Sequence, residues 1–96
     1  MPDPRLGPRV RADLARIYRH SEDRGGRQQA DRYTREIEAV LGLIFDNPGM
    51  TRLRTEFDPP IRVHPHGAHV ILYHDGPPVR LLRILHHRQG WLSRLR

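Results

Sequence analysis

The first half of the chain carries apolar residues at helical spacing, in two runs. Val10, Leu14 and Ile17 lie four and three residues apart, which predicts one apolar helix face. We expect this helix over residues 8–25, ended by a pair of glycines. A second run over residues 28–46 repeats at a period of 3.6 and stops at an Asn-Pro-Gly sequence. Because the link between the runs is short, the sequence predicts an antiparallel helical hairpin.

The second half alternates apolar and polar residues, which is typical of half-buried strands. We expect strands over residues 61–64, 69–74 and 79–86, separated by Pro- and Gly-rich turns, and a short N-terminal strand at Arg5-Leu6. The polar stretch between helices and strands is expected to be irregular. Helices followed by clustered strands predict an α+β fold with a three-stranded antiparallel meander and a short C-terminal tail or helix. The 96 residues suffice for a single domain spanning 1–96.

The helical hairpin is expected to cover one face of this sheet. The other face, or the groove beside the helices, would then be open to a partner. Alternation along the last strand predicts that Leu81, Arg83 and Leu85 share one face, with Arg80 and Leu82 on the other.

Charge is distributed unevenly between the two halves. All 17 basic residues are arginine, and the formal net charge is +6. Residues 1–51 hold nine arginines against eight acids, whereas residues 52–96 hold eight against three, with six of the seven histidines. The sheet should therefore be cationic, which favours nucleic acid or an acidic protein as a partner. The alternative is an arginine-rich surface that is merely solvated.

Several classes of protein are excluded by composition. The chain has no cysteine, so disulfides, thiolate metal sites and a cysteine nucleophile are absent. This composition suits a reducing cytosol. No apolar run is long enough for a transmembrane helix, and the N-terminus lacks the apolar stretch of a secretory signal. We expect a cytoplasmic protein that does not contact the membrane.

Four stretches of the sequence carry a recognisable pattern and cover most of residues 5–90. They read LGPRVRADLARIYRHSEDR, QQADRYTREIEAVLGLIFDNPGM, IRVHPHGAHVILYHDG and VRLLRILHHRQG. They include the acidic-Leu pair Asp13-Leu14 and the Arg-Ile-Leu-His sequence of Arg83 to His86. Together the four stretches resemble the ParE/RelE superfamily of bacterial toxins, and its ParE branch in particular.

The resemblance implies the toxin half of a type II toxin–antitoxin system, of the kind that arrests growth and stabilises plasmids. A cognate ParD-like antitoxin would bind the toxin as a hetero-oligomer, and DNA would be contacted only through that complex. ParE-type toxins inhibit DNA gyrase, whereas RelE-type toxins cleave messenger RNA on the ribosome. The shared fold does not choose between these activities, so the choice depends on site residues.

The basic residues favour the inhibitor over the nuclease. RelE-like enzymes use lysines, arginines and a Tyr or His near the C-terminus, but this chain has no lysine, and its tail, GWLSRLR, has no tyrosine. Arg52 and Arg54 are the only basic residues in the loop before the sheet, and arginine is a poor acid or base. We expect no enzymatic activity. The alternatives are a ribosome-dependent RNase that uses His69, His86, His87 and Arg88, or an inactive binding module in a repressor complex.

A histidine metal site is a further alternative. His64, His66 and the His86-His87 pair could supply nitrogen ligands. Pro65 separates the first two, and the nearby acids are few, so we expect no metal and no cofactor.

Two contact surfaces are predicted with the ParE-type interpretation. The antitoxin should meet apolar residues left over from the core and the edge strand around Ile61, which offers unpaired backbone. The residues predicted for antitoxin binding are Leu6, Tyr18, Tyr33, Leu43, Phe45, Phe57, Ile61 and Val63. The family resemblance assigns target binding to the C-terminal strand and tail, at His86, Arg88, Trp91 and Arg94.

Overall fold

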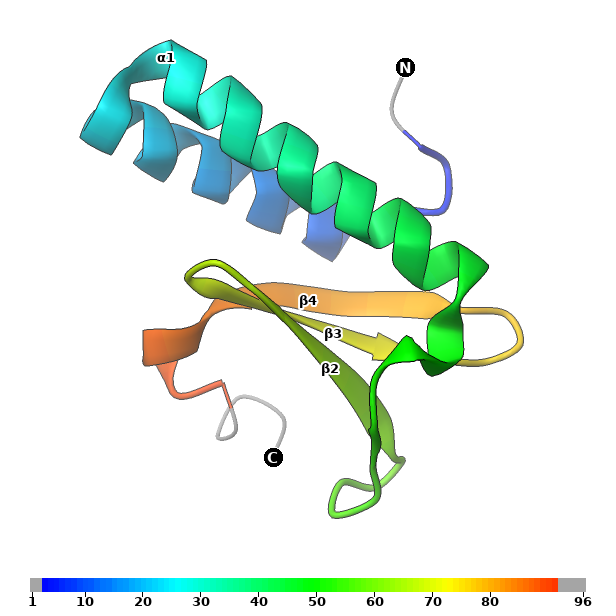
Figure 1. Ribbon diagram of the computed structural model, residues 1–96. Coiled ribbons are helices and arrows are strands. Elements are labelled where there is room, and N and C mark those ends of the chain that lie inside the picture. The colour runs from blue at the N-terminus through cyan, green and yellow to red at the C-terminus, as the bar shows by residue number, and fades with distance from the viewer. Residues whose placement is uncertain (1–2, 92–96) are drawn as a thin grey trace.

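The protein has two layers, a kinked helix lying across one face of an antiparallel sheet (Figure 1). The structure, a computed structural model, describes residues 3–91. The strands follow one another across the sheet in the order β1-β2-β3-β4. The elements are α1 (Pro8–Asp46), the 3-10 turn η1 (Pro48–Met50), β1 (Leu53–Arg54), β2 (Ile61–His66), β3 (His69–His74), β4 (Arg80–His86) and the 3-10 turn η2 (His87–Gln89).

A single residue folds α1 back on itself. Gly26 has φ 86° and ψ 173°, a backbone conformation that is essentially restricted to glycine. The residues before it (the first arm, 8–25) and after it (the second arm, 27–46) lie side by side in opposite directions (Figure 1). Tyr18 of the first arm donates a 2.8 Å hydrogen bond to Asp31 of the second. The structure therefore has one kinked helix where the sequence predicts two separate helices, because only one residue leaves the helical conformation.

The predicted N-terminal strand is absent. Arg5 and Leu6 lie in a turn, because Asp3 satisfies this backbone locally: its carboxylate accepts from Arg5 N at 2.9 Å and its carbonyl from Leu6 N at 3.1 Å. The Leu6 side chain still packs in the core.

A strand that was not predicted, β1, joins the expected three-stranded meander, so the sheet has the order β1-β2-β3-β4. The segment predicted to be irregular contains β1, which pairs with Arg62 and Ile61 of β2. The backbone of Ile61 is consequently paired on that side, and the edge of β2 continues beyond β1 from Val63 to His66. Pro65 lies inside this strand opposite Val70, which is compatible with proline because its missing N–H can face the open edge.

Apolar residues form two cores, one on each face of the sheet. The first lies between α1 and the sheet and includes Ile37, Ile71 and Tyr73. The second lies on the opposite face and consists of Ile61, Val70, Leu72 and Leu85, with Phe57, Val63, Leu82 and Trp91 packed against it. This face is therefore partly covered by the segment before β2.

A register shift in β4 changes which of its side chains lie on the same face of the sheet. The pairing of β3 and β4 slips between Leu72 and Tyr73, so Leu82 is skipped. As a result Leu81 packs in the first core while Leu85 joins Leu82 in the second. The prediction that Leu81 and Leu85 share a face is wrong, because a bulge interrupts the alternation.

Asp13 anchors the first arm to β4. Its buried carboxylate accepts hydrogen bonds from Arg83 Nε at 2.9 Å, from the backbone N–H of Ile84 at 2.8 Å and from Arg16 at 2.9 Å. Burial by itself raises the pKa of Asp13, but these hydrogen bonds outweigh it and hold the pKa below its ordinary value. Within residues 3–91, no helix is both long and apolar enough to cross a membrane.

Candidate functional site

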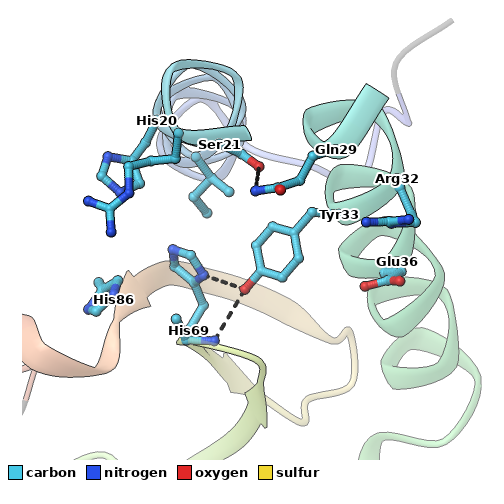
Figure 2. Close-up of a pocket in the computed structure, with 11 residues that line it drawn as sticks. His20, Ser21, Gln29, Arg32, Tyr33, Glu36, His69 and His86 are labelled. Carbon is cyan, nitrogen blue, oxygen red and sulfur yellow. Dashed lines mark hydrogen bonds between the residues drawn. The ribbon is translucent and has the colours of Figure 1, made fainter. Parts of the chain in front are cut away.

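A polar pocket opens between the two arms of α1 and the adjoining ends of β3 and β4 (Figure 2). It has a volume of about 470 Å³ and adjoins a second hollow that adds Arg16 and Arg88. We call the two together the histidine pocket. Its polar lining includes His20, Arg24, Arg32, Tyr33, His69 and His86.

Regular secondary structure explains why these side chains converge. His69 begins β3 and His86 ends β4, and the two are paired across the antiparallel ladder, so their side chains share a face. Arg16, His20 and Arg24 are four residues apart on the first arm and therefore form one stripe above them.

Tyr33 and His69 form the centre of the pocket. The Tyr33 hydroxyl lies 2.7 Å from Nδ1 of His69 and accepts a 3.3 Å hydrogen bond from the backbone N–H of Ala68. Burial lowers the pKa of His69 to about 4, and repulsion from His86, His20, Arg16 and His66 acts in the same direction. His69 is therefore neutral at pH 7.

His86 continues the cluster toward solvent. Its ring centroid lies 5.3 Å from that of His69, edge to face, and 4.9 Å from that of His87, stacked. Burial lowers the pKa of His86, as do the neighbouring His87, Arg88 and His20. The pKa shifts of His69 and His86 both favour neutral imidazoles at pH 7.

The positive charge of the pocket comes from arginine. Among residues 3–91, neither Arg24 nor Arg88 forms an ion pair, whereas Arg16 is bound to Asp13. Among residues 3–91, Glu36 is the one acid that lines the pocket, and its carboxylate lies 3.6 Å from Nε2 of His66. The described lining is consequently cationic.

The residues predicted for a nuclease do lie close together. His69, His86 and Arg88 line the histidine pocket, and His87 stacks on His86 with Nδ1 2.8 Å from the Ala68 carbonyl oxygen. Sequence reasoning missed His20 and Arg24, which the helix contributes. The spacing of four between Arg16, His20 and Arg24 is the signal that could have found them.

The residues predicted for antitoxin binding are spread over the molecule. Leu6 and Ile61 are only 8% and 4% exposed and belong to different cores, whereas Leu43 is 51% exposed. The remaining five are partly buried. Tyr18 and Tyr33 form hydrogen bonds, and the Phe45 ring lies against the guanidinium of Arg5. Phe57 and Val63 pack against the second core. Their role in antitoxin binding stays a prediction.

The residues predicted for target binding fall in two places. His86 and Arg88 line the histidine pocket. Trp91 packs on the opposite face of the sheet, with its ring centroid 6.2 Å from that of Phe57. Arg94 lies outside the described residues.

The described histidines are not arranged as the ligands of a metal ion. Across residues 3–91, no three His, Asp or Glu side chains are grouped so that they could hold a metal ion. His66 faces Glu36 instead, and Nδ1 of His64 is buried without a hydrogen-bond partner.

Comparison with known proteins gives consistent matches along most of the chain. Residues 5–91 match the family described as the ParE toxin of the type II toxin–antitoxin system parDE. The chain is similar to Toxin ParE1 of Caulobacter vibrioides, with 38% identity over 82 residues that cover 85% of each chain. It is also similar to Toxin ParE1 of Mycobacterium tuberculosis, with 31% identity over 86 residues that cover 86% of this chain and 87% of the relative.

Proposed function

Since the chain belongs to the ParE toxin family of type II toxin–antitoxin systems, we propose that it inhibits DNA gyrase and is neutralised by a cognate ParD-like antitoxin. The observation that carries this proposal is the family match over residues 5–91, which includes both layers of the fold. Gyrase would be met in the cytoplasm, and its inhibition would arrest growth.

The chemistry of the pocket supports an inhibitor rather than an enzyme. A protein that blocks another protein needs a complementary surface and no catalytic groups. Burial keeps His69 neutral at pH 7, with a pKa of about 4, and the chain has no lysine. His69 is therefore a poor general acid for a leaving oxygen at pH 7.

The antitoxin is expected to form a hetero-oligomer with the toxin and to make whatever contact with DNA the complex has. Leu43, the most exposed of the predicted apolar contacts, and the open edge of β2 from Val63 to His66 are the described features best suited to it. An apolar side chain at a partner surface and an unpaired strand edge are common anchors for a wrapping segment.

Expression in bacteria tests the toxin–antitoxin proposal. Induction of this chain alone should stop growth, and co-expression with the small open reading frame next to its gene should restore growth. The two proteins should also purify as one complex. Normal growth on induction, together with nanomolar antitoxin binding, would favour the inactive repressor module instead.

One observation favours a second candidate, an mRNA interferase of the RelE type. The rings of His69 and His86 lie 5.3 Å apart beside Arg88, which is a workable arrangement of imidazoles and a phosphate clamp. Primer extension on translated messages should then show cuts in the ribosomal A site after induction. Equal cutting by the protein with His69, His86 and His87 all changed to Ala would reject this candidate.

A further inference from the structure

We propose that the histidine pocket binds the phosphate group of a small phosphate monoester, between the first arm of α1 and the ends of β3 and β4. This inference depends on neither gyrase inhibition nor RNA cleavage. It rests on the position of the polar groups, the absence of an ion pair at two of the arginines among residues 3–91, and the size of the pocket.

Donors reach the pocket from separate elements. His20 and Arg24 belong to the first arm, His69 is the first residue of β3, and Arg88 follows the end of β4. Figure 2 shows His20 and His86 on one side of the pocket, with His69 between them and Tyr33. A tetrahedral anion accepts hydrogen bonds from several directions, which suits this arrangement, whereas one planar guanidinium already satisfies a carboxylate.

Two of these cations have no ion-pair partner among the described residues. The guanidinium groups of Arg24 and Arg88 form no ion pair among residues 3–91. The other arginines near the sheet are mostly occupied, since Arg54, Arg62 and Arg83 are bound to Glu56, Asp75 and Asp13 in that order. Arg24 and Arg88 can therefore pair with an external anion without breaking an ion pair of the described residues.

His69 is held in a fixed orientation. Its Nδ1 lies 2.7 Å from the Tyr33 hydroxyl, which donates to the His66 carbonyl oxygen at 3.3 Å. In Figure 2 the second ring nitrogen is turned toward the side of the pocket where His20 and His86 lie. According to the tautomer of the ring, this nitrogen donates to a phosphate oxygen or accepts from a phosphate hydroxyl.

The size of the pocket indicates a small molecule. The first of its two hollows has a volume of about 470 Å³, which falls in the range of sites for small ligands. Ile17 and the ring of Tyr33 supply an apolar wall for the organic part of such a ligand. Polar and cationic groups beside an apolar wall are the features expected of a phosphate monoester site.

Histidine ring signals in NMR spectra of the purified protein test the proposal. Inorganic phosphate and adenosine 5′-monophosphate should each shift the signals of His20, His69 and His86 in a saturable way, whereas sodium chloride of equal ionic strength should not. A tetranucleotide with hydroxyl ends carries only phosphodiesters. If it binds as well as phosphate and the monophosphate, the site accepts the phosphates of nucleic acid in addition to free esters.

Matched variants locate the site. Arg24→Gln combined with Arg88→Gln should weaken phosphate binding roughly tenfold or more, because two charge-assisted hydrogen bonds are lost. Arg52→Gln, an exposed arginine outside the pocket, should bind phosphate as the parent protein does. The proposal is overturned if phosphate and the monophosphate give no saturable shift, or if the double variant binds them equally well. Binding of the tetranucleotide or of an acidic peptide, without phosphate or the monophosphate, overturns it too.

Discussion

Asp13 and Arg83, which are 70 residues apart in the sequence, form a two-point ion pair in which Nε and Nη2 of Arg83 lie 2.9 Å and 3.0 Å from the Asp13 carboxylate oxygens. The pair joins the first arm of α1 to β4. Asp13 belongs to the acidic-Leu pair and Arg83 to the Arg-Ile-Leu-His sequence, so two of the sequence features that resemble the ParE branch contact each other. The resemblance therefore has a structural basis in the docking of helix on sheet.

Removal of Asp13 should destabilise the protein strongly. Asp13→Ala leaves Arg83 and the buried N–H of Ile84 without their acceptor, which should lower the free energy of unfolding by about 3 kcal/mol. Urea denaturation followed by circular dichroism measures this. Asp23→Ala, at an exposed acid that forms no ion pair among residues 3–91, is the control and should cost less than about 0.5 kcal/mol.

The same pair predicts an acid transition. Because the pKa of Asp13 is lowered in the folded protein, its contribution to stability is fully present above about pH 4 and is lost as the pH falls through the folded-state pKa. The Asp13→Ala protein should therefore lose less stability than the parent between pH 4 and pH 2. An equal loss of stability in the two proteins between pH 4 and pH 2 would contradict this role of Asp13.

His69 predicts a second pH effect at milder acidity. An unfolded histidine has a pKa near 6.5, whereas the pKa of His69 is about 4, so the unfolded state binds the proton more readily between these values. Stability should fall by about 1–2 kcal/mol between pH 7.5 and pH 5, and His69→Gln should reduce that fall. The charged or titratable groups facing His69 are His86, His20, Arg16, His66 and Tyr33.

Urea denaturation at the two pH values measures this effect. His74→Gln is a suitable control, because His74 lies at the other end of β3 and contacts the Pro60 carbonyl oxygen. If His69→Gln leaves the fall in stability unchanged while His74→Gln reduces it, the effect comes from His74, and the prediction for His69 is wrong.

The two arms of α1 depend on Gly26. Gly26→Ala should destabilise the protein by about 1–3 kcal/mol, because a side chain strains the backbone at φ 86°, although nothing lies within 4 Å of the added carbon. Gly42→Ala is the matched control inside the second arm, also with free space around the added carbon. Because alanine is the better helix former, Gly42→Ala should be neutral or stabilising by up to about 1 kcal/mol. Thermal denaturation separates the two outcomes.

Leu43 offers a direct test of antitoxin contact. Leu43→Arg should weaken antitoxin binding about tenfold or more while stability changes little, because the side chain is 51% exposed. Met50→Arg alters the other large apolar side chain exposed among residues 3–91, at 43%, and should leave binding unchanged. Isothermal titration with the antitoxin compares the two variants. Equal binding by the parent and Leu43→Arg would remove Leu43 from the predicted surface.

Much of the fold could be predicted from periodicity, and the exceptions have local causes. The strand over His69–His74 occurs with the predicted bounds, since its apolar run and flanking turns are strong signals. The two-residue strand β1 has no periodic signal, because two residues are too few to alternate. The bulge opposite Leu72 depends on pairing between strands, which the sequence of one strand does not encode.

The candidate site was predicted less completely, because it is built from distant segments. The sequence singled out His69, His86 and Arg88, but it did not indicate that His20 and Arg24 of the first arm lie above them. That juxtaposition depends on how the arm docks on the sheet, and the ion pair of buried Asp13 with partly buried Arg83 is one contact between them.

The most direct test of the proposed function is supercoiling of relaxed plasmid by purified gyrase and ATP in the presence of this protein. The account predicts a dose-dependent loss of supercoiling, which prior incubation with the antitoxin prevents. Complete supercoiling at a large molar excess of folded, antitoxin-binding protein would contradict gyrase inhibition.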